Sequence, residues 1–133
     1  LLNMFINFTW EEFDKSVEII SDKSKNWNLS GIYGIPRGGL CLAVALSHKL
    51  NIELLKEPKN NILIVDDIYD SGETLNRYKD FLGSKHFVLI SKIEPVWWDS
   101  VQIISKDKWV VFPWEEKENR KNDMDKYHLR MKR

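Results

Sequence analysis

The stretch at residues 62–74, ILIVDDIYDSGET, constrains the fold of this chain more than any other. It opens with four apolar residues and no polar alternation, which is typical of a strand buried on both faces of a parallel sheet. Asp66 and Asp67 follow directly, at the strand end where open α/β sheets bind ligands. Two carboxylates at that edge suit the hydroxyl groups of a sugar, directly or through Mg²⁺. The stretch therefore predicts an α/β fold with a ligand site after this strand.

The turn at residues 70–74, Asp-Ser-Gly-Glu-Thr, predicts an anion site beside the carboxylate pair. Gly72 can take a positive φ, and Ser71 and Thr74 add two hydroxyl groups. Backbone N–H groups open there into a helix that we expect to run from about Thr74 to Leu82. Such a turn fits a phosphate group.

A second phosphate-binding loop is expected at residues 36–39, Pro-Arg-Gly-Gly. It lies between a short strand at residues 31–35 and an apolar helix at residues 40–50. Gly38 and Gly39 let the backbone approach a ligand, and Arg37 supplies a forked donor. The alternative is a simple strand-to-helix turn with a solvated Arg37.

Residues 65–74, VDDIYDSGET, resemble the motif with which type I phosphoribosyltransferases bind 5-phosphoribosyl-1-pyrophosphate (PRPP). The resemblance implies that Asp66 and Asp67 hold the ribose 2′- and 3′-hydroxyls. It implies that the 5′-phosphate is bound by the residues of the turn, namely Asp70, Ser71, Gly72, Glu73 and Thr74. A strand ending in two aspartates also occurs in phosphoacceptor and Mg²⁺-binding proteins, so the motif depends on the turn that follows.

The same resemblance assigns roles to the remaining polar groups. Arg37, Gly38 and Gly39 would bind the pyrophosphate of PRPP, beside a non-proline peptide that is often cis in this family. Asp70 would accept the purine proton. Mg²⁺ would be bound mainly by PRPP oxygens and water, so that Asp66 and Asp67 contact the metal only indirectly.

Lys92, Trp109 and Val110 are the predicted base-binding residues. Lys92 ends a strand expected at residues 86–92 and can donate to O6 of an oxopurine, while Trp109 offers a stacking face and Val110 its backbone. The segment at residues 109–115, WVVFPWE, is similar to the xanthine-guanine and hypoxanthine-guanine branch. The alternatives are a solvated Lys92 and a Trp109 that serves packing, the role we expect for Trp97 and Trp98.

The rest of the chain predicts a Rossmann-like, mostly parallel sheet with flanking helices, a small hood and a short flexible loop. Thr9 and Glu12 form a capping box for a helix at residues 10–24, and further strands are expected at residues 51–55 and 101–104. The connection at residues 56–61 is too short for the long mobile loop usual in the family. We expect one domain over residues 1–133, with residues 116–133 a charged helix or tail.

The composition restricts the classes of partner that this chain is expected to bind. Twenty basic and twenty acidic residues give no net charge, so no nucleic acid is expected as a partner. One cysteine and no long apolar stretch favour a cytoplasmic protein without a membrane partner. Family members are commonly dimers or tetramers, so a homo-oligomer is expected.

These features predict a purine phosphoribosyltransferase, a pentosyltransferase enzyme of purine salvage. It would transfer the phosphoribosyl group of PRPP to guanine, xanthine or hypoxanthine, with Mg²⁺. Two alternatives remain: a regulator that senses PRPP with little or no catalysis, and a pyrimidine or orotate enzyme, which the Trp109 segment disfavours.

Overall fold

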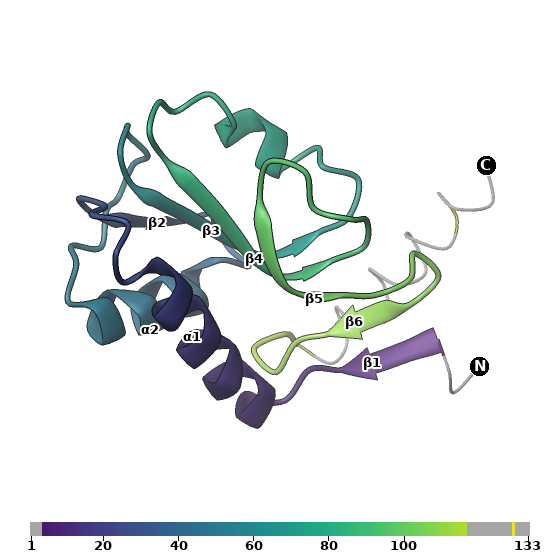
Figure 1. Cartoon of the computed structure of the whole chain (residues 1–133). Helices are drawn as coiled ribbons and strands as arrows, with labels where there is room; N and C mark the ends of the chain where they lie inside the picture. The colour runs from purple at the N-terminus through teal and green to yellow at the C-terminus, as the bar shows by residue number, and fades with distance from the viewer. Residues whose placement is uncertain (1–3, 117–128, 130–133) are drawn as a thin grey trace. The chain divides into compact units, whose positions relative to one another are not determined.

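The computed structural model describes residues 4–116 and 129 of the 133-residue chain (Figure 1). The chain divides into two compact units, Asp14–Lys106 and Leu1–Phe13 with Asp107–Arg133, and each is described by itself. The predicted C-terminal helix or tail lies outside the described residues, apart from Glu116 and Leu129. No helix in the described ranges is long and apolar enough to cross a membrane.

The larger unit is built on a four-stranded parallel sheet with the strand order β2-β3-β4-β5. The strands are β2 (Ile32–Gly34), β3 (Leu63–Tyr69), β4 (Lys85–Ser91) and β5 (Asp99–Ile103). Helices α1 (Trp10–Ser24) and α2 (Leu40–Leu50) lie on one face of the sheet, and the short helix η2 (Leu75–Tyr78) lies on the other (Figure 1). The sheet is thus covered on both faces, as the apolar start of β3 predicts.

Alternate residues of β3, together with Ile62 directly before it, supply the two layers of the core. Ile62 and Ile64 belong to a cluster that includes Leu75 of η2, and both are fully buried. Leu63 and Val65 are also fully buried, and successive strand residues point to opposite faces. Burial on both faces holds β3 in the middle of the sheet and fixes where its carboxyl end emerges.

Helix α1 and helix α2 have the predicted bounds, whereas the predictions for three other segments are wrong. Strand β3 does not end at Val65 but continues to Tyr69, so the two aspartates lie inside the strand. Residues 51–55 form no strand, because Asn51 ends α2 in the left-handed region with φ 53° and only Leu54 makes a bridge, to Ile32.

The segment after Thr74 is a 3₁₀ helix of four residues, where an α-helix to Leu82 was expected. Leu75, Tyr78 and Phe81 recur every three residues and all pack against the same core cluster. A helix with three residues per turn aligns this spacing on one face. Gly83, with φ 71°, follows and turns the chain into β4.

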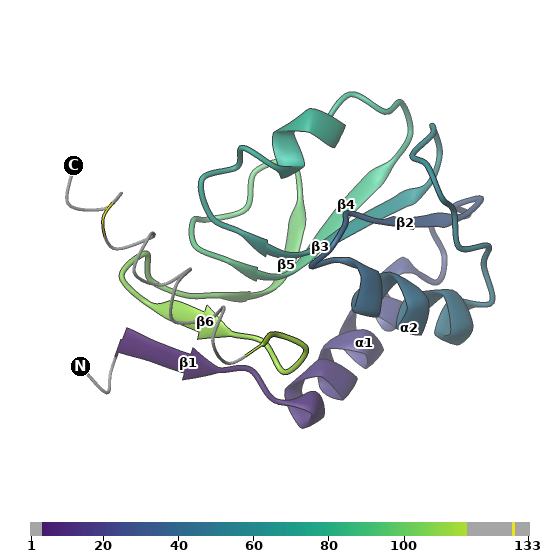
Figure 2. The ribbon, with the colours of Figure 1, turned by 180° about the vertical axis from the view of Figure 1, so that it is seen from behind.

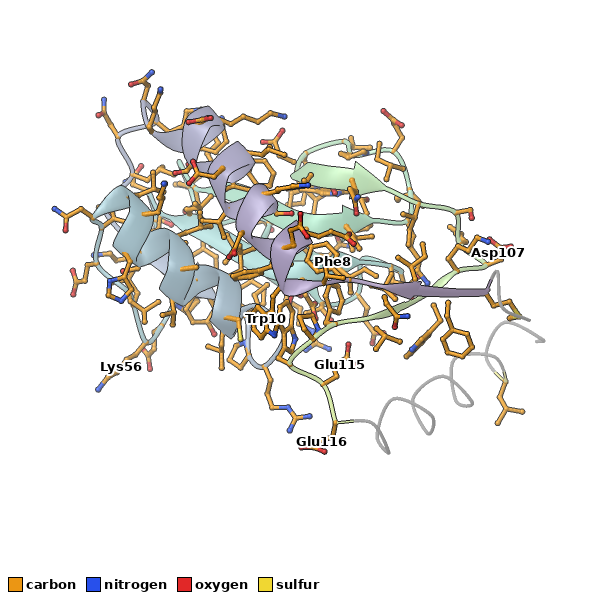
Figure 3. All side chains as sticks on the ribbon, turned by 90° about the horizontal axis from the view of Figure 1, so that it is seen from below. Phe8, Trp10, Lys56, Asp107, Glu115 and Glu116 are labelled. Atoms are coloured by element: carbon orange, nitrogen blue, oxygen red, sulfur yellow. The ribbon has the colours of Figure 1, made fainter. Side chains whose placement is uncertain are left out.

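The smaller unit contains a parallel pair of strands, neither of which the sequence analysis predicted. Strand β1 (Phe5–Asn7) pairs with β6 (Trp109–Val111), with Phe5 opposite Trp109 (Figure 2). Phe112 and Trp114 stack with centroids 5.0 Å apart, and the Phe112 N–H donates to Glu115 Oε1 at 2.9 Å. The ring of Phe8 contacts that of Phe112, and the ring of Trp10 contacts that of Trp114. Figure 3 labels Phe8, Trp10 and Glu115.

Candidate active site

The carboxylate pair lies where β3 outruns its neighbour β2. The pairing of β2 with β3 ends at Gly34 and Val65, whereas β3 continues beside β4 to Tyr69. Asp66 is buried and Asp67 is half-buried, and the Asp67 N–H donates to Asp66 Oδ1 at 2.9 Å. The early end of β2 leaves this edge of β3 to a loop.

That loop is residues 36–39, and it packs directly on the carboxylate pair. A Cβ atom on Gly38 would lie 2.3 Å from Asp67 Oδ2, and one on Gly39 would lie 2.4 Å from the Val65 carbonyl oxygen. Both contacts are far closer than a side chain tolerates, so only glycine fits at either position. The loop predicted for pyrophosphate and the strand predicted for ribose therefore share one site.

The conformation of the same loop agrees with the prediction. The Pro36–Arg37 peptide is cis, and Arg37 is exposed. Gly39 caps α2 without a side-chain hydrogen bond, and the first turn of α2 has no acidic residue. An anion approaching the amino end of α2 meets Arg37 and a favourable helix dipole, with no carboxylate of that turn against it.

Residues 66–75 line a cavity of about 150 Å³. Its floor is the end of β3 and its wall is the turn at residues 70–74, in which Gly72 has φ 84°, as predicted. Ser71 Oγ accepts the Glu73 N–H at 3.3 Å, and the Gly72 carbonyl accepts the Asn76 N–H at 2.9 Å. One concave surface thus combines carboxylates with hydroxyl and amide donors.

Lys92 lies beside this cavity and is buried. Its side chain is 1% exposed, and Nζ lies 3.8 Å from Asp70 Oδ2. The Lys92 N–H donates to the Tyr69 carbonyl at 2.9 Å, because β3 and β4 run side by side to their ends. This burial contradicts the solvated alternative and brings the predicted base-contacting cation next to the predicted proton acceptor.

Trp109 and Val110 belong to the smaller unit, where Trp109 is half-buried and Val110 is buried within β6. The two units are described separately, so base binding by these two residues stays a prediction. Trp98 is 4% exposed, as expected of a packing residue, and Trp97 is half-buried.

The electrostatics of the carboxylate pair favour a cation or hydroxyl donors. Burial, and secondarily the charge of Asp67, raises the pKa of Asp66 to about 9. Burial also raises the pKa of Asp67. The ion pairs found within residues 4–116 do not involve either carboxylate. Sugar hydroxyls or a nearby Mg²⁺ would stabilise the charged form that burial disfavours.

The described residues contain no group of three histidine, cysteine or acidic side chains that holds a metal by itself. Asp66 and Asp67 line the cavity, and an indirect contact with Mg²⁺ through ribose or water stays a prediction for them.

No protein-family profile matches the chain, but individual proteins do. Xanthine-guanine phosphoribosyltransferase from Chromohalobacter salexigens is 24% identical over 132 aligned positions, covering 80% of this chain and 82% of that protein. The enzyme of the same name from Cereibacter sphaeroides is 25% identical and covers 80% and 84%.

Solved structures agree with these relatives. Purine phosphoribosyltransferase from Pyrococcus horikoshii is 28% identical with a TM-score of 0.72, covering 84% of this chain and 95% of that one. In sequence and in fold the chain resembles the type I phosphoribosyltransferases. Xanthine-guanine-hypoxanthine phosphoribosyltransferase from Helicobacter pylori, 18% identical with a TM-score of 0.68, shares the fold over 90% of this chain. These sequence relatives and structural neighbours are pentosyltransferase enzymes, and the sequence relatives lie in the xanthine-guanine branch.

Proposed function

We propose that this phosphoribosyltransferase transfers the 5-phosphoribosyl group of PRPP to a 6-oxopurine, giving a nucleoside monophosphate and pyrophosphate. The observation that carries the proposal is the cavity lined by the Asp66–Asp67 pair and by the turn at residues 70–74, here called the phosphate-type turn. Asp70 of this turn lies 3.8 Å from the buried Lys92. The names of the relatives, which specify xanthine and guanine, support the choice of a purine.

Each substrate group has a counterpart of matching chemistry. The carboxylates of Asp66 and Asp67 accept hydrogen bonds from the ribose hydroxyls, and the turn at residues 70–74 donates to the 5′-phosphate. Residues 36–39, packed against Asp67, hold the pyrophosphate with Arg37. Mg²⁺ bound to PRPP would neutralise the pyrophosphate as it leaves.

The Lys92–Asp70 pair binds the base and accepts its proton in this proposal. Lys92 donates to O6 of the purine, which places the ring nitrogen near Asp70 as the proton acceptor. Because Lys92 is buried, its charge is only weakly screened and is available to a planar oxopurine rather than to bulk water. Base binding by Trp109 and Val110 remains a prediction from the sequence. A homo-oligomer and a cytoplasmic location remain predictions.

A panel of bases tests the proposal. Guanine, xanthine, hypoxanthine, adenine and orotate are each incubated with the protein, PRPP and Mg²⁺, and nucleotide and pyrophosphate are followed. We expect nucleotide from at least one 6-oxopurine and none from orotate. PRPP binding without nucleotide from any base would support the PRPP-sensing alternative, and failure to bind PRPP would refute both.

A further inference from the structure

Trp98 lies behind both halves of the proposed site. Its ring stacks on Tyr69 with centroids 3.8 Å apart and 12° between the planes. Its Nε1–H donates to Ser91 Oγ at 3.2 Å, and it is 4% exposed. One buried side chain therefore contacts the residue before Asp70 and the residue before Lys92.

Tyr69 transmits the first contact to the phosphate-type turn. Its hydroxyl lies against the turn, since a Cβ atom on Gly72 would come within 2.2 Å of the Tyr69 hydroxyl oxygen. Its carbonyl accepts the Lys92 N–H at 2.9 Å. A shift of the Tyr69 ring would therefore displace the turn that holds the 5′-phosphate.

Ser91 transmits the second contact to the base side. It is fully buried, and its hydroxyl donates to the Ile93 carbonyl at 2.6 Å while it accepts from Trp98. The bond from Ser91 to Ile93 connects the residues on either side of Lys92, and the bond from Trp98 holds Ser91 in place. Because the chain is buried there, a lost bond is not readily replaced by water, and the peptides around Lys92 become free to move.

We propose that Trp98 is a positioning residue for both substrates: through Tyr69 it sets the phosphate-type turn, and through Ser91 it sets Lys92. The inference rests on the proposed function for the roles of Lys92 and the turn. A role in packing alone predicts something different, namely lower stability with unchanged affinity of the folded fraction for PRPP and base.

Conservative variants separate the two contacts. Trp98→Phe keeps a ring over Tyr69 but removes the N–H, Ser91→Ala removes its acceptor, and Tyr69→Phe removes only the hydroxyl beneath the turn. The control is Trp27→Phe, because Trp27 stacks on Phe87 of the same sheet with centroids 6.3 Å apart and has no contact with the site residues in that stack.

We expect the variants to change the KM for the base and the KM for PRPP separately. Trp98→Phe and Ser91→Ala each raise the KM for the base by roughly fivefold to tenfold and change the KM for PRPP by less than about twofold. The double variant is no worse than Ser91→Ala alone, because Ser91→Ala already removes the acceptor of the Trp98 N–H along with the bond to Ile93. Tyr69→Phe raises the KM for PRPP instead, and Trp27→Phe changes neither.

Hydrogen exchange of the Lys92 amide gives a readout that needs no turnover. In the unliganded protein this amide should exchange at least about threefold faster in Trp98→Phe and Ser91→Ala than in Trp27→Phe. The inference is overturned if Trp98→Phe, Ser91→Ala and Trp27→Phe have the same Lys92 exchange rate and the same KM values for the base and for PRPP. If the wild type uses no base, the proposed function fails, and the Lys92 exchange rate decides the role of Trp98 by itself.

Discussion

Replacement of Asp66 by asparagine should stabilise the fold and abolish PRPP binding at the same time. Burial raises the pKa of the Asp66 carboxyl from 3.8 to about 9. Between these values the folded chain keeps a proton that the unfolded chain releases, so the free energy of unfolding falls as pH rises from about 4 to about 9. Below about pH 4 both states are protonated and the effect vanishes.

The loss of unfolding free energy is set by how far the pH lies above the pKa of Asp66 in the unfolded chain. At pH 7 the interval above 3.8 is about three units, which corresponds to roughly 4 kcal/mol if the folded state keeps its proton rigidly. Movement of the half-buried neighbour Asp67 and entry of water into the cavity reduce this. We expect Asp66→Asn to gain about 1–2 kcal/mol at pH 8 and close to nothing at pH 4.

Urea unfolding at pH 4, 6 and 8, followed by circular dichroism, measures the gain, and calorimetry with PRPP and Mg²⁺ measures the loss. Asp80→Asn is the matched control, because Asp80 is exposed and lies in the same unit, outside the residues that line the cavity. A gain that is equal at all three pH values, or retained PRPP affinity in Asp66→Asn, would refute the reasoning.

Three further outcomes are expected. Lys92→Met should lower kcat/KM for 6-oxopurines by about tenfold to a hundredfold and change the PRPP Kd by less than about twofold; normal kinetics would leave the buried lysine a structural role. Gly38→Ala should weaken PRPP binding by at least about tenfold, since its Cβ would overlap the Asp67 carboxylate. Its control, Gly31→Ala, meets mainly the movable Leu55 side chain and should bind PRPP normally. Because residues 56–61 are too short to cover the sugar, PRPP should be hydrolysed measurably without base; rapid, hydrolysis-free turnover would contradict this.

Local patterns predicted the parts of the fold that depend on local physics. The capping box at Thr9 and Glu12 is formed, with the Glu12 N–H donating to Thr9 Oγ1 at 3.1 Å, and α1 begins at the expected residue. The apolar run of α2 likewise gave its bounds. Strand β1 was not predicted, because three residues are too few to show a periodicity and its partner β6 lies about a hundred positions later in the chain.

The extent of β3 was misjudged for a related reason. Asp66 and Asp67 read as the end of a strand because carboxylates are rarely buried, yet β4 continues beside them, and Ile68 and Tyr69 pair with Ile90 and Ser91. The length of a strand is decided by its neighbour, which a single segment of sequence does not reveal.

The same distinction between local and long-range features applies to the candidate site. The turn at residues 70–74 is one continuous segment, so its residue types were enough to predict its conformation, including the positive φ of Gly72. The contacts of Gly38 with Asp67 and of Lys92 with Asp70 join segments far apart in the chain. All four residues were predicted as site residues from the sequence. Which of them contact each other depends on strand order and register, which the sequence analysis did not predict.

The unequal lengths of β2 and β3 connect the fold to the chemistry. If β2 continued past Gly34 in register with β3, its backbone would occupy the edge beside Asp66 and Asp67, and residues 36–39 could not reach the carboxylates. Its early end places the carboxylate pair beside a glycine loop instead of another strand, and burial disfavours the charge that a ligand could stabilise. The loss of stability at Asp66 and the proposed affinity for a polyhydroxyl ligand are therefore two consequences of one structural cause. A longer β2 would stabilise the sheet and remove the site.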